Sequence, residues 1–526
     1  MILKKSTKNQ KKLLIFHILT KLVKNCIIIS YRNSEYIIRM KIMKSDFRRS
    51  AAAFISAVMF ISTFSCASTV SRDEPENSQT EPETTIQTAV TEAVEATSEE
   101  SPNASSTENA TESTTKSASG KKGNIYDVKG KLLVSNSEDG TKRVYSDDYA
   151  VSTANLVTSM SDGYDKTFED ILSGGDNGQS VQLTIDADVQ NAVYQYMQSM
   201  NLVGSVVAMR SDGSILAQVS YPSYDPRTVE KQDYDEELAW GKCGNKAFQN
   251  FEPGSCFKIM SEVIADKHGV YSLYDEGEWK FDGISIVNWD HDTNGSYPME
   301  RSLSSAFVNS SNIFFAKAFD QIGKDAVLAD LDDIFHFVTP IDCDFGEINN
   351  NVEIYCEDDL RRTAFGQSYV LTCPIFLAAL GREAVLGDMV KPFVIKSITS
   401  PTDVNSQVAE GSKPNEVIAS IPQDYRQNLL NGMSGVASGL GVYVPQGYEL
   451  YTKTGTAETW ENDFLYITGC VKAQNDTGNK DYGDYSNYDG SYIIVMQVRN
   501  PAEHGYSFAS HSAPLYQGVV NAVVGN

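Results

Sequence analysis

The sequence has no cluster of basic residues over most of its 526 residues. Lys and Arg number 44 against 69 Asp and Glu, so the net charge is −25, and no run of positive charge follows Arg49. Proteins that bind nucleic acid gather Lys and Arg where the phosphate backbone lies. The composition therefore argues against nucleic acid as a partner.

Cysteine is also scarce, and the eight Cys residues form no Cys-Xaa-Xaa-Cys pair or other metal-binding spacing. Asp290-His291-Asp292 groups three potential ligands, but it lies in a predicted loop, and we expect no metal and no other cofactor. Six Cys residues lie in the part that we expect to be extracytoplasmic: Cys243, Cys256, Cys343, Cys356, Cys373 and Cys470. An oxidising compartment permits disulfides, but the sequence assigns no pairs. Several of the six lie in apolar stretches, where Cys behaves as a small hydrophobic residue.

Aromatic and large aliphatic residues are almost absent from residues 71–119, where Thr, Ser, Glu, Ala and Pro dominate. The stretch from Asp73 to Glu112 contains eleven carboxylates and no Lys or Arg. Such a segment cannot bury enough apolar surface to fold, and its like charges keep it extended. We therefore interpret residues 71–122 as a disordered acidic linker.

Long uncharged apolar runs are equally scarce, and the clearest one spans residues 51–70. It is just long enough to cross a bilayer and follows Lys44, Arg48 and Arg49, so the positive-inside rule puts the later residues outside the cytoplasm. Two interpretations stay open: an uncleaved signal anchor, or a lipoprotein signal peptide with lipidation of Cys66. In both, the chain is tethered at the extracytoplasmic face of the plasma membrane.

Residues 1–50 form a basic segment with thirteen Lys or Arg and two acidic residues. Its apolar stretch, residues 13–30, is interrupted by two lysines, which makes it a weak membrane span. Met40 or Met43 would begin a conventional signal segment with a short basic head. We therefore expect the natural start there, with the earlier residues upstream of it.

Three short motifs, in one order, are typical of an active-site serine: Ser-Cys-Phe-Lys at 255–258, Ser-Ser-Asn at 310–312 and Lys-Thr-Gly at 453–455. A nucleophilic hydroxyl needs a base, a proton shuttle, an oxyanion hole and a cation for the substrate carboxylate. Singly, the motifs also fit structural roles: a capping serine before a surface lysine, a helix N-cap and an exposed strand. Together, with the Glu-Pro-Gly that precedes the first, they favour an acyltransferase.

The stretch Asn245–Lys258 (NKAFQNFEPGSCFK) resembles the nucleophile segment of class B penicillin-binding proteins, the transpeptidases that cross-link bacterial peptidoglycan. Gly178–Gln190 resembles the entry into the catalytic domain of that family, and Gly204–Pro226 resembles its first strand pair. The resemblance extends from Gly123 to Val524 and is closest to the short subgroup typified by penicillin-binding protein A.

The resemblance implies a role for each residue of the first two motifs. Ser255 is the expected nucleophile and Lys258 its base, and a three-residue spacing places both on one face of a helix. Ser310 is expected to relay a proton to the leaving amine. Asn312 is expected to bind the substrate amide and to orient Lys258. Cys256 departs from the family pattern, which usually has Thr there.

The third motif is expected on an edge strand beside the nucleophile. Lys453 and Thr454 would hold the terminal carboxylate of a D-Ala-D-Ala peptide or a penicillin, and Gly455 would allow close approach of backbone and ligand. The backbone N–H groups of Thr456 and Ser255 would form the oxyanion hole. The aromatic pair that usually follows this motif in the family is missing.

The pattern and the resemblance together predict an α+β fold of the penicillin-binding-protein and serine β-lactamase type, with an antiparallel sheet flanked by helices and a helical subdomain. The predicted elements include helices 186–200 and 514–524 and strands 203–209, 214–220, 464–472 and 491–498. We assign residues 123–177 to a small N-terminal module and residues 178–526 to the penicillin-binding transpeptidase domain.

We therefore predict a peptidoglycan D,D-transpeptidase that cross-links stem peptides through a Ser255 acyl-enzyme and is inhibited by β-lactams. Its expected partners are a D-Ala-D-Ala donor, an amine acceptor, β-lactams and a membrane glycan polymerase. The nearest alternative is a D,D-carboxypeptidase or β-lactamase of the same fold. In these enzymes water, and not an amine, resolves the acyl-enzyme. A non-catalytic scaffold or β-lactam sensor is the other alternative, and three intact motifs argue against it.

Overall fold

A computed structural model of the chain describes two separate units, residues 1–111 and 112–526. The described residues are 27–32, 35–40 and 122–525, except for 140–141, 159–169, 175–177, 229–240, 242, 282, 292–296, 402, 460–461, 481 and 483–484. In the first unit, β1 (Ile27–Arg32) and β2 (Glu35–Met40) pair antiparallel. The predicted membrane segment, Cys66 and the acidic linker up to residue 121 lie outside the described residues. None of the described helices is long and apolar enough to cross a membrane.

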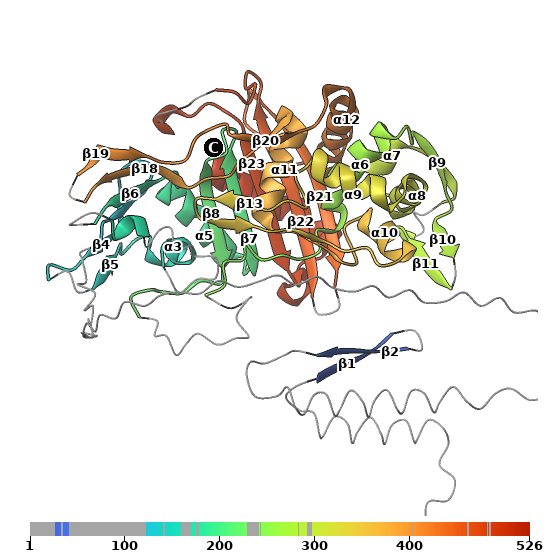
Figure 1. Cartoon of the computed structure of the whole chain (residues 1–526), viewed down its shortest axis with the longest axis horizontal. Helices are drawn as coiled ribbons and strands as arrows, with labels where there is room; N and C mark the ends of the chain where they lie inside the picture. Colours follow the sequence, from blue (N-terminus) through green and yellow to red (C-terminus); the bar gives the residue numbers. More distant parts are fainter. Residues whose placement is uncertain are drawn as a thin grey trace, which may run out of the picture. The chain divides into compact units, whose positions relative to one another are not determined.

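A five-stranded antiparallel sheet forms the centre of the second unit (Figure 1). Its strands, in spatial order, are β21 (Tyr448–Glu458), β22 (Asp463–Ala473), β23 (Tyr492–Arg499), β7 (Gly204–Arg210) and β8 (Ile215–Tyr221). Because β21 pairs only with β22 in this sheet, one long side of β21 is an open edge.

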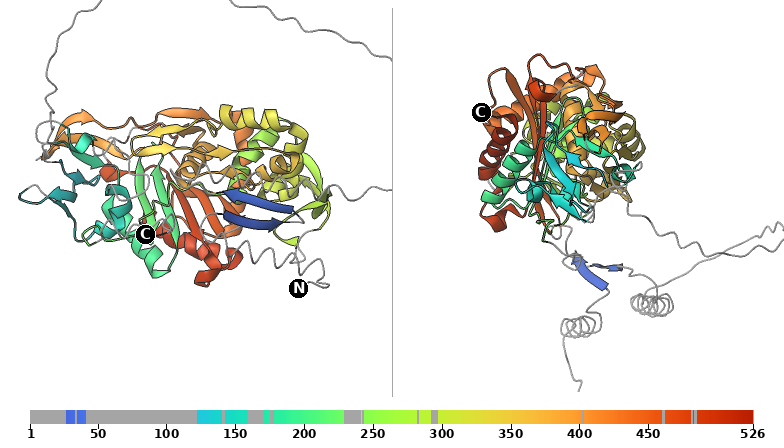
Figure 2. Two further views of the ribbon diagram at one scale, coloured as in Figure 1. Left: turned by 60° about the horizontal axis from the view of Figure 1, so that its bottom comes forward. Right: turned by 90° about the vertical axis from the view of Figure 1, so that its left-hand side faces the viewer.

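Both faces of this sheet are apolar, as the alternation along β23 illustrates. Ile494, Met496 and Val498 point into one buried cluster, whereas Ile493 and Val495 point into another. Side chains alternate across a strand, so an unbroken apolar run is buried on both sides. Figure 2 shows the sheet between two layers of helices.

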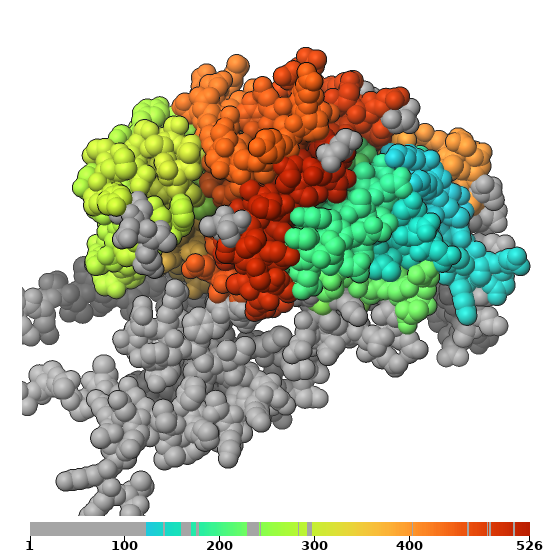
Figure 3. Space-filling model, turned by 180° about the vertical axis from the view of Figure 1, so that it is seen from behind, coloured from blue at the N-terminus to red at the C-terminus, as the bar shows by residue number. Residues whose placement is uncertain are grey.

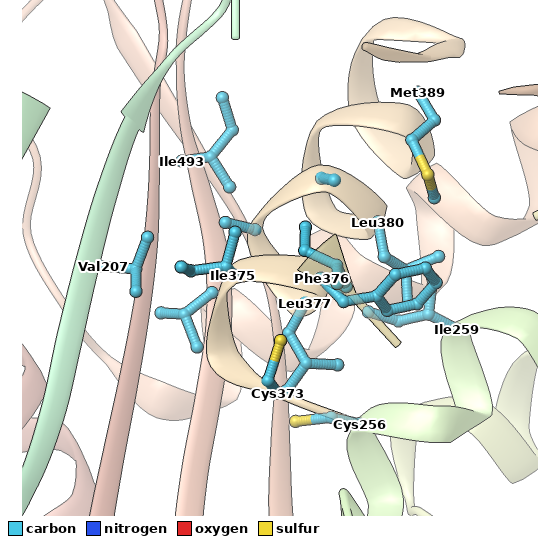
Figure 4. Close-up of a cluster of buried hydrophobic side chains, with 14 of the residues drawn as sticks. Val207, Cys256, Ile259, Cys373, Ile375, Phe376, Leu377, Leu380, Met389 and Ile493 are labelled. Atoms are coloured by element: carbon cyan, nitrogen blue, oxygen red, sulfur yellow. The ribbon is translucent and has the colours of Figure 1, made fainter. Parts of the chain in front are cut away.

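One layer consists of α5 (Ala187–Ser199) and α13 (Phe508–Val524), which lie side by side in Figure 3. On the other face lies α11 (Pro374–Leu386), all of whose residues are buried. Figure 4 shows its apolar side chains between Val207 and Ile493 of the sheet and Ile259 of the next helix. A helix this apolar is stable only in such a core, and the two charged residues of α11, Arg382 and Glu383, are buried with the rest of it.

Beyond α11 lies a mainly helical region that carries the first two motifs. Its helices are α6 (Lys258–Lys267), α7 (Leu303–Val308), α8 (Asn312–Ile322), α9 (Lys324–Asp333), α10 (Glu357–Thr363) and α12 (Gln423–Leu440). Short antiparallel pairs accompany them: β9 (Ser272–Asp275) with β12 (Met299–Ser302), β10 (Glu278–Phe281) with β11 (Ile284–Val287), β13 (Ile341–Cys343) with β14 (Gly346–Ile348), β15 (Asn351–Val352) with β16 (Val370–Leu371), and β17 (Asp388–Val390) with β20 (Val417–Ser420). This architecture is the predicted α+β fold.

A second, six-stranded sheet contains segments from both sides of the predicted module boundary at residue 177. Its order is β19 (Asp403–Glu410), β18 (Ile395–Ser400), β6 (Ser180–Leu183), β3 (Ile125–Tyr126), β4 (Leu132–Asn136) and β5 (Arg143–Tyr145), with α3 (Ala150–Val157) following β5. The strands before residue 177 thus share a sheet with later ones. The division at residue 177 stays a prediction.

Most predicted elements are confirmed with small shifts. Asp186 caps α5 by accepting from the N–H groups of Asp188 and Val189, and the strand pair β7–β8 turns at Asp212-Gly213 as expected. The predicted start of the last helix at Pro514 is wrong, because α13 begins at Phe508 and includes that proline. Tyr516 and its apolar neighbours are buried against the sheet, and this packing outweighs the lost backbone bond.

Candidate active site

The nucleophile segment begins with a tight turn that needs glycine. Gly254 has φ +54°, and a Cβ there would lie 2.3 Å from the carbonyl oxygen of Thr456. Its N–H donates to the Gly366 carbonyl at 2.9 Å. A 3₁₀ turn over Gly254–Phe257 follows, and α6 begins at Lys258, so the predicted helix through Ser255 starts with a tighter turn. The turn still brings the Ser255 hydroxyl to the Lys258 amine.

Four oxygen atoms surround the amine of Lys258, whose residue is fully buried. Lys258 Nζ lies 3.1 Å from Ser255 Oγ, 3.2 Å from Ser310 Oγ, and 2.7 Å from both the Ser310 carbonyl oxygen and Asn312 Oδ1. The two shortest contacts are to oxygens that can only accept, so they take two amine hydrogens. The Asn312 amide is oriented by its Nδ2, which donates to the Val287 carbonyl at 2.9 Å.

The surroundings of Lys258 favour a neutral amine. Burial and the nearby positive charge of Lys453 together hold the pKa of Lys258 well below its usual range, while Asp275 acts in the opposite direction. Desolvation disfavours the charged form of a lysine, and a like charge adds to that effect. The amine therefore has a lone pair available at a lower pH than an exposed lysine does.

The second motif lies at the junction of α7 and α8, as predicted. Ser310 adopts φ +56°, an uncommon conformation for a residue with a side chain. Ser311 is the N-cap of α8, and its Oγ accepts from the N–H of Phe314 at 3.1 Å. The turned backbone at Ser310 directs both its carbonyl and its hydroxyl to Lys258.

The third motif lies on the edge strand β21, directly against the nucleophile turn. A Cβ at Gly455 would come within 2.9 Å of both the Pro253 carbonyl oxygen and Cys256 Sγ, so only glycine allows this approach. Cys256 is buried at the contact, and its Sγ lies 3.5 Å from the Lys453 carbonyl oxygen. The two backbones that bear Ser255 and Thr456 are thus packed together.

Lys453 connects the strand to the second motif. Its Nζ donates to Ser310 Oγ at 3.0 Å and to the Thr454 carbonyl at 2.8 Å. Burial lowers the pKa of Lys453 to about 8. Thr454, next to Lys453, is half-buried, and Thr456 is exposed.

Sequence reasoning missed a buried polar group beneath the second motif. Asp275, at the end of β9, accepts from Ser311 Oγ at 2.7 Å, and Asn288 Oδ1 accepts from the Asn312 N–H at 2.8 Å. In the sequence, Asp275-Glu276-Gly277 indicates only a turn. No pattern in the chain pairs this aspartate with residues of the later motif.

The remaining predictions concern ligation and the cysteines. Among the residues that the structure describes, no group of three or more His, Cys, Asp or Glu could hold a metal ion, and Asp292 lies outside them. All six later cysteines are described, and five are buried, as small hydrophobic residues would be. Trp460 and Glu461, in the segment that replaces the expected aromatic pair, also lie outside the described residues.

An antiparallel sheet between helical layers, with a Ser–Lys pair against its open edge strand, defines the class of serine β-lactamase-like folds. Residues 204–477, more than half of the chain, match the sequence model of the penicillin binding protein transpeptidase domain. The chain therefore belongs to this family.

Curated relatives extend the match. The chain is 27% identical over 358 residues to penicillin-binding protein 3 of Bacillus subtilis, covering 63% of this chain and 49% of that protein. It is 26% identical over 324 residues to peptidoglycan D,D-transpeptidase PbpA of Mycobacterium tuberculosis, covering 56% and 64%. The chain thus spans about half to two thirds of the length of these relatives.

Solved structures share the fold. The imipenem acyl-enzyme complex of penicillin-binding protein A from M. tuberculosis superposes with a TM-score of 0.63 at 22% identity, over 77% of this chain and 99% of that one. The D,D-transpeptidase domain of a peptidoglycan glycosyltransferase from Eggerthella lenta gives a TM-score of 0.62 at 20% identity, over 77% and 99%.

Proposed function

We propose that the protein is a membrane-tethered peptidoglycan D,D-transpeptidase. Ser255 attacks the D-Ala-D-Ala carbonyl of a stem peptide, terminal D-Ala leaves, and the amine of a second stem peptide takes the acyl group. The observation that carries this proposal is the chain of contacts from Ser255 through Lys258 and Ser310 to Lys453, in a member of this family.

Lys258 acts as the base in the first step. Its two short bonds to the Ser310 carbonyl and to Asn312 Oδ1 use both hydrogens of a neutral amine, which leaves the lone pair for the hydroxyl of Ser255 at 3.1 Å. As the Ser255 oxygen bonds to the carbonyl carbon, its proton passes to Lys258. A buried amine with a lowered pKa is suited to this transfer at neutral pH.

Ser310 returns that proton to the leaving group. Its hydroxyl lies between the two lysines, 3.2 Å from Lys258 and 3.0 Å from Lys453. When the carbon–nitrogen bond breaks, Ser310 gives its proton to the amine of the departing D-Ala and is reprotonated by Lys258. In the second step the proton transfers run in the opposite direction. The acceptor amine attacks the acyl-enzyme and loses a proton through Ser310 to Lys258. Lys258 then returns a proton to the Ser255 oxygen, which leaves as the cross-link forms.

The edge strand β21 holds the donor peptide. Lys453 supplies positive charge for the terminal carboxylate, with the hydroxyl of Thr454 as its partner. The backbone N–H groups of Ser255 and Thr456 stabilise the oxyanion, because the nucleophile turn and the strand pack without intervening side chains at Gly254 and Gly455. A penicillin carries the same carboxylate and a more reactive carbonyl, so it acylates Ser255 by the same path.

One contact argues against efficient deacylation by water. Glu357, in the segment that weakly resembles the deacylating loop of class A β-lactamases, forms an ion pair with Arg361 at 3.0 Å. Arg361 also binds Asp320 at 2.7 Å, which attaches α10 to α8. Arg361 stands where that loop has Asn, and here it binds two carboxylates, so the segment lacks the amide of a deacylating loop, which favours transfer to an amine over hydrolysis.

The proposal includes location and partners. The tether is an anchor over residues 51–70 or a lipid on Cys66, and residues 71–122 form the spacer on the extracytoplasmic side. A membrane glycan polymerase supplies the strands that carry the stem peptides. Stem peptides and β-lactams are the ligands, and the chemistry above needs no metal or other cofactor.

Product analysis tests the proposal. The full chain is incubated with lipid-linked disaccharide peptide and a purified polymerase, and the products are separated after digestion of the glycan. Cross-linked dimers with released D-Ala, absent in Ser255→Ala, are the expected result. Free D-Ala without dimers would indicate a carboxypeptidase, and rapid turnover of penicillin a β-lactamase. A folded wild type that neither forms products nor labels with fluorescent penicillin would refute the proposal.

A further inference from the structure

Asp275 is a fully buried carboxylate at the end of β9, and it accepts hydrogen bonds from four residues. The donors are Arg301 Nε at 2.6 Å, Ser311 Oγ at 2.7 Å, the N–H of Gly277 at 2.9 Å, and Asn288 Nδ2, which lies 2.9 and 3.1 Å from its two oxygens. Burial acts to raise the pKa of Asp275, but these bonds hold it below its usual value. The group is therefore a carboxylate anion at neutral pH.

This cluster is attached to the turn that forms the second motif. Ser311 donates to Asp275, and Asn288 Oδ1 accepts from the backbone N–H groups of Asn312 at 2.8 Å and Ile313 at 3.3 Å. Ser310, with its left-handed φ of +56°, directly precedes this anchored segment. Such a conformation persists only where the surroundings over-determine it.

We propose that Asp275 is a positioning residue for the proton transfers of this site: through Ser311 and Asn288 it holds the strained Ser310 turn so that Ser310 and Asn312 surround the Lys258 amine. This inference rests on the proposed function, in which Lys258 is the base. Asp275 itself touches neither the nucleophile nor the substrate. Its partners connect two short strands, β9 and β12, to the start of α8.

Asp275 also acts on Lys258 through its charge. Two charged side chains face the Lys258 amine from other elements: Lys453 of β21, which lowers its pKa beyond the effect of burial, and Asp275 of β9, which raises it. Arg301 of β12 faces Asp275 in turn. Loss of the carboxylate charge would make the amine of Lys258 less basic, so the proton transfer would slow and the amine would lose its proton at lower pH.

Two substitutions separate position from charge. Asp275→Asn keeps the shape but removes the charge and one acceptor, whereas Ser311→Ala removes the link to the turn and keeps the carboxylate. The full chain is acylated with a fluorescent penicillin across a range of pH, and the acylation rate constant is measured separately from the dissociation constant of the initial complex. Asp330→Asn is the control, since Asp330 is a buried carboxylate bonded to His268 at 2.7 Å, at the end of α6 opposite Lys258.

We expect a loss of about 10- to 100-fold in the acylation rate constant for both variants, the scale of a small misplacement of catalytic groups, with little change in initial binding. The acid limb of the profile moves to lower pH in Asp275→Asn and stays in place in Ser311→Ala. A folded Asp275→Asn with an unchanged rate constant, or an unmoved acid limb, overturns the inference. If Asp275→Asn does not fold, Ser311→Ala tests the inference. An unchanged acylation rate constant in Ser311→Ala overturns the inference, and a lower rate constant with unchanged initial binding supports it.

The two proposals fail in different ways. If the wild type itself is not acylated at Ser255, or is acylated without cross-linking, the proposed function fails. If the wild type is acylated and Asp275→Asn and Ser311→Ala equal it, only the inference about Asp275 fails. Asp330→Asn should resemble the wild type in rate constant and pH profile in every case, whatever its stability.

Discussion

Two successive turns of α6 bury ionisable groups with opposite consequences. Lys258 in the first turn is surrounded by four oxygen atoms. Glu262, one turn later, is 1% exposed, and neither of its carboxylate oxygens has a hydrogen-bond partner among the residues that the structure describes. Burial lowers the pKa of Lys258 and, with help from Asp266, raises the pKa of Glu262.

Burial thus favours the neutral form of both groups, but only Lys258 has partners that allow its neutral form to take part in chemistry. The neutral Lys258 has its two hydrogens bonded and its lone pair near Ser255, whereas the neutral Glu262 has no hydrogen-bond partner among the described residues. Glu383 on α11 repeats the second case: it is fully buried, and both of its oxygens lack partners among the described residues. Burial of a titratable group becomes chemistry only where its partners are arranged as well.

The largest effect should come from Lys258→Ala. Because the base and its nucleophile act as a unit, its loss should slow acylation of Ser255 by penicillin by about a thousandfold or more. Stopped-flow measurement with a fluorescent penicillin gives the rate constant.

Lys246→Met is a matched control, because Lys246 is also a buried lysine with a pKa lowered by burial to about 7. Among the described residues, its amine donates to three backbone carbonyls, those of Pro222, Gly241 and Gly244. This variant should melt earlier but, when folded, be acylated at nearly the wild-type rate. Equal losses in the two variants would mean that burial of a lysine, and not its place in the cluster, determines the effect.

Lys453→Ala should have a smaller effect. Removal of a charge-assisted contact to the ligand carboxylate costs about 1.5–3 kcal/mol, or roughly ten- to a hundredfold. The loss should appear mainly in the initial binding of penicillin, since Lys258 and Ser255 keep their contact. A loss as large as that of Lys258→Ala, located in the chemical step, would contradict this division of roles between the two lysines.

The sequence was sufficient for the parts of this site that depend on local structure. The three-residue spacing of Ser255 and Lys258 requires a shared helix face, and Ser-Ser-Asn is a natural start for a helix. The edge position of β21 followed from the resemblance. Asp275 was not predictable, because its bonds to Arg301 and Ser311 form only when β9, β12 and α8 are packed together. The lack of hydrogen-bond partners around Glu262 among the described residues was not predictable either, because it arises only when the core is packed.

The pH profile of acylation should sharpen the comparison between the two site lysines. For the free enzyme, the rate rises with pH as Lys258 loses its proton, well below the usual range of lysine because its pKa is lowered by burial and by Lys453. The rate falls again as pH rises through the pKa of Lys453, about 8, because the cation is then lost. The alkaline decline should be about tenfold per pH unit at most and should be absent in Lys453→Ala. A decline that persists in that variant would have another source.

The smallest effects should come from the buried glutamates, and they concern stability alone. In Glu262→Met and Glu383→Met, two oxygens without hydrogen bonds are replaced by an apolar chain of similar length. Relief of such a buried polar group is worth about 1–3 kcal/mol. We expect a gain of this size in the free energy of unfolding at pH 7, observed as a rise of a few degrees in the melting temperature. Acylation of Ser255 should not change.

The dependence of this gain on pH distinguishes the buried glutamates from ordinary surface residues. Burial raises the pKa of both Glu262 and Glu383 well above the ordinary value of 4.5. Below pH 4.5 both the folded and the unfolded chain hold the proton, so pH has no effect on the difference. As pH rises above 4.5 the unfolded chain loses the proton and the folded chain keeps it, so the wild type becomes progressively less stable. The gain in the Met variants should therefore grow from pH 4.5 towards pH 7.

Glu410→Met, at an exposed position on β19, should stay within about 0.5 kcal/mol of the wild type at either pH. An equal gain at pH 4.5 and pH 7 in the buried variants would indicate that these glutamates are ionised in the folded protein at pH 7. The comparison with Lys258, in which burial makes both kinds of group neutral, would then be wrong.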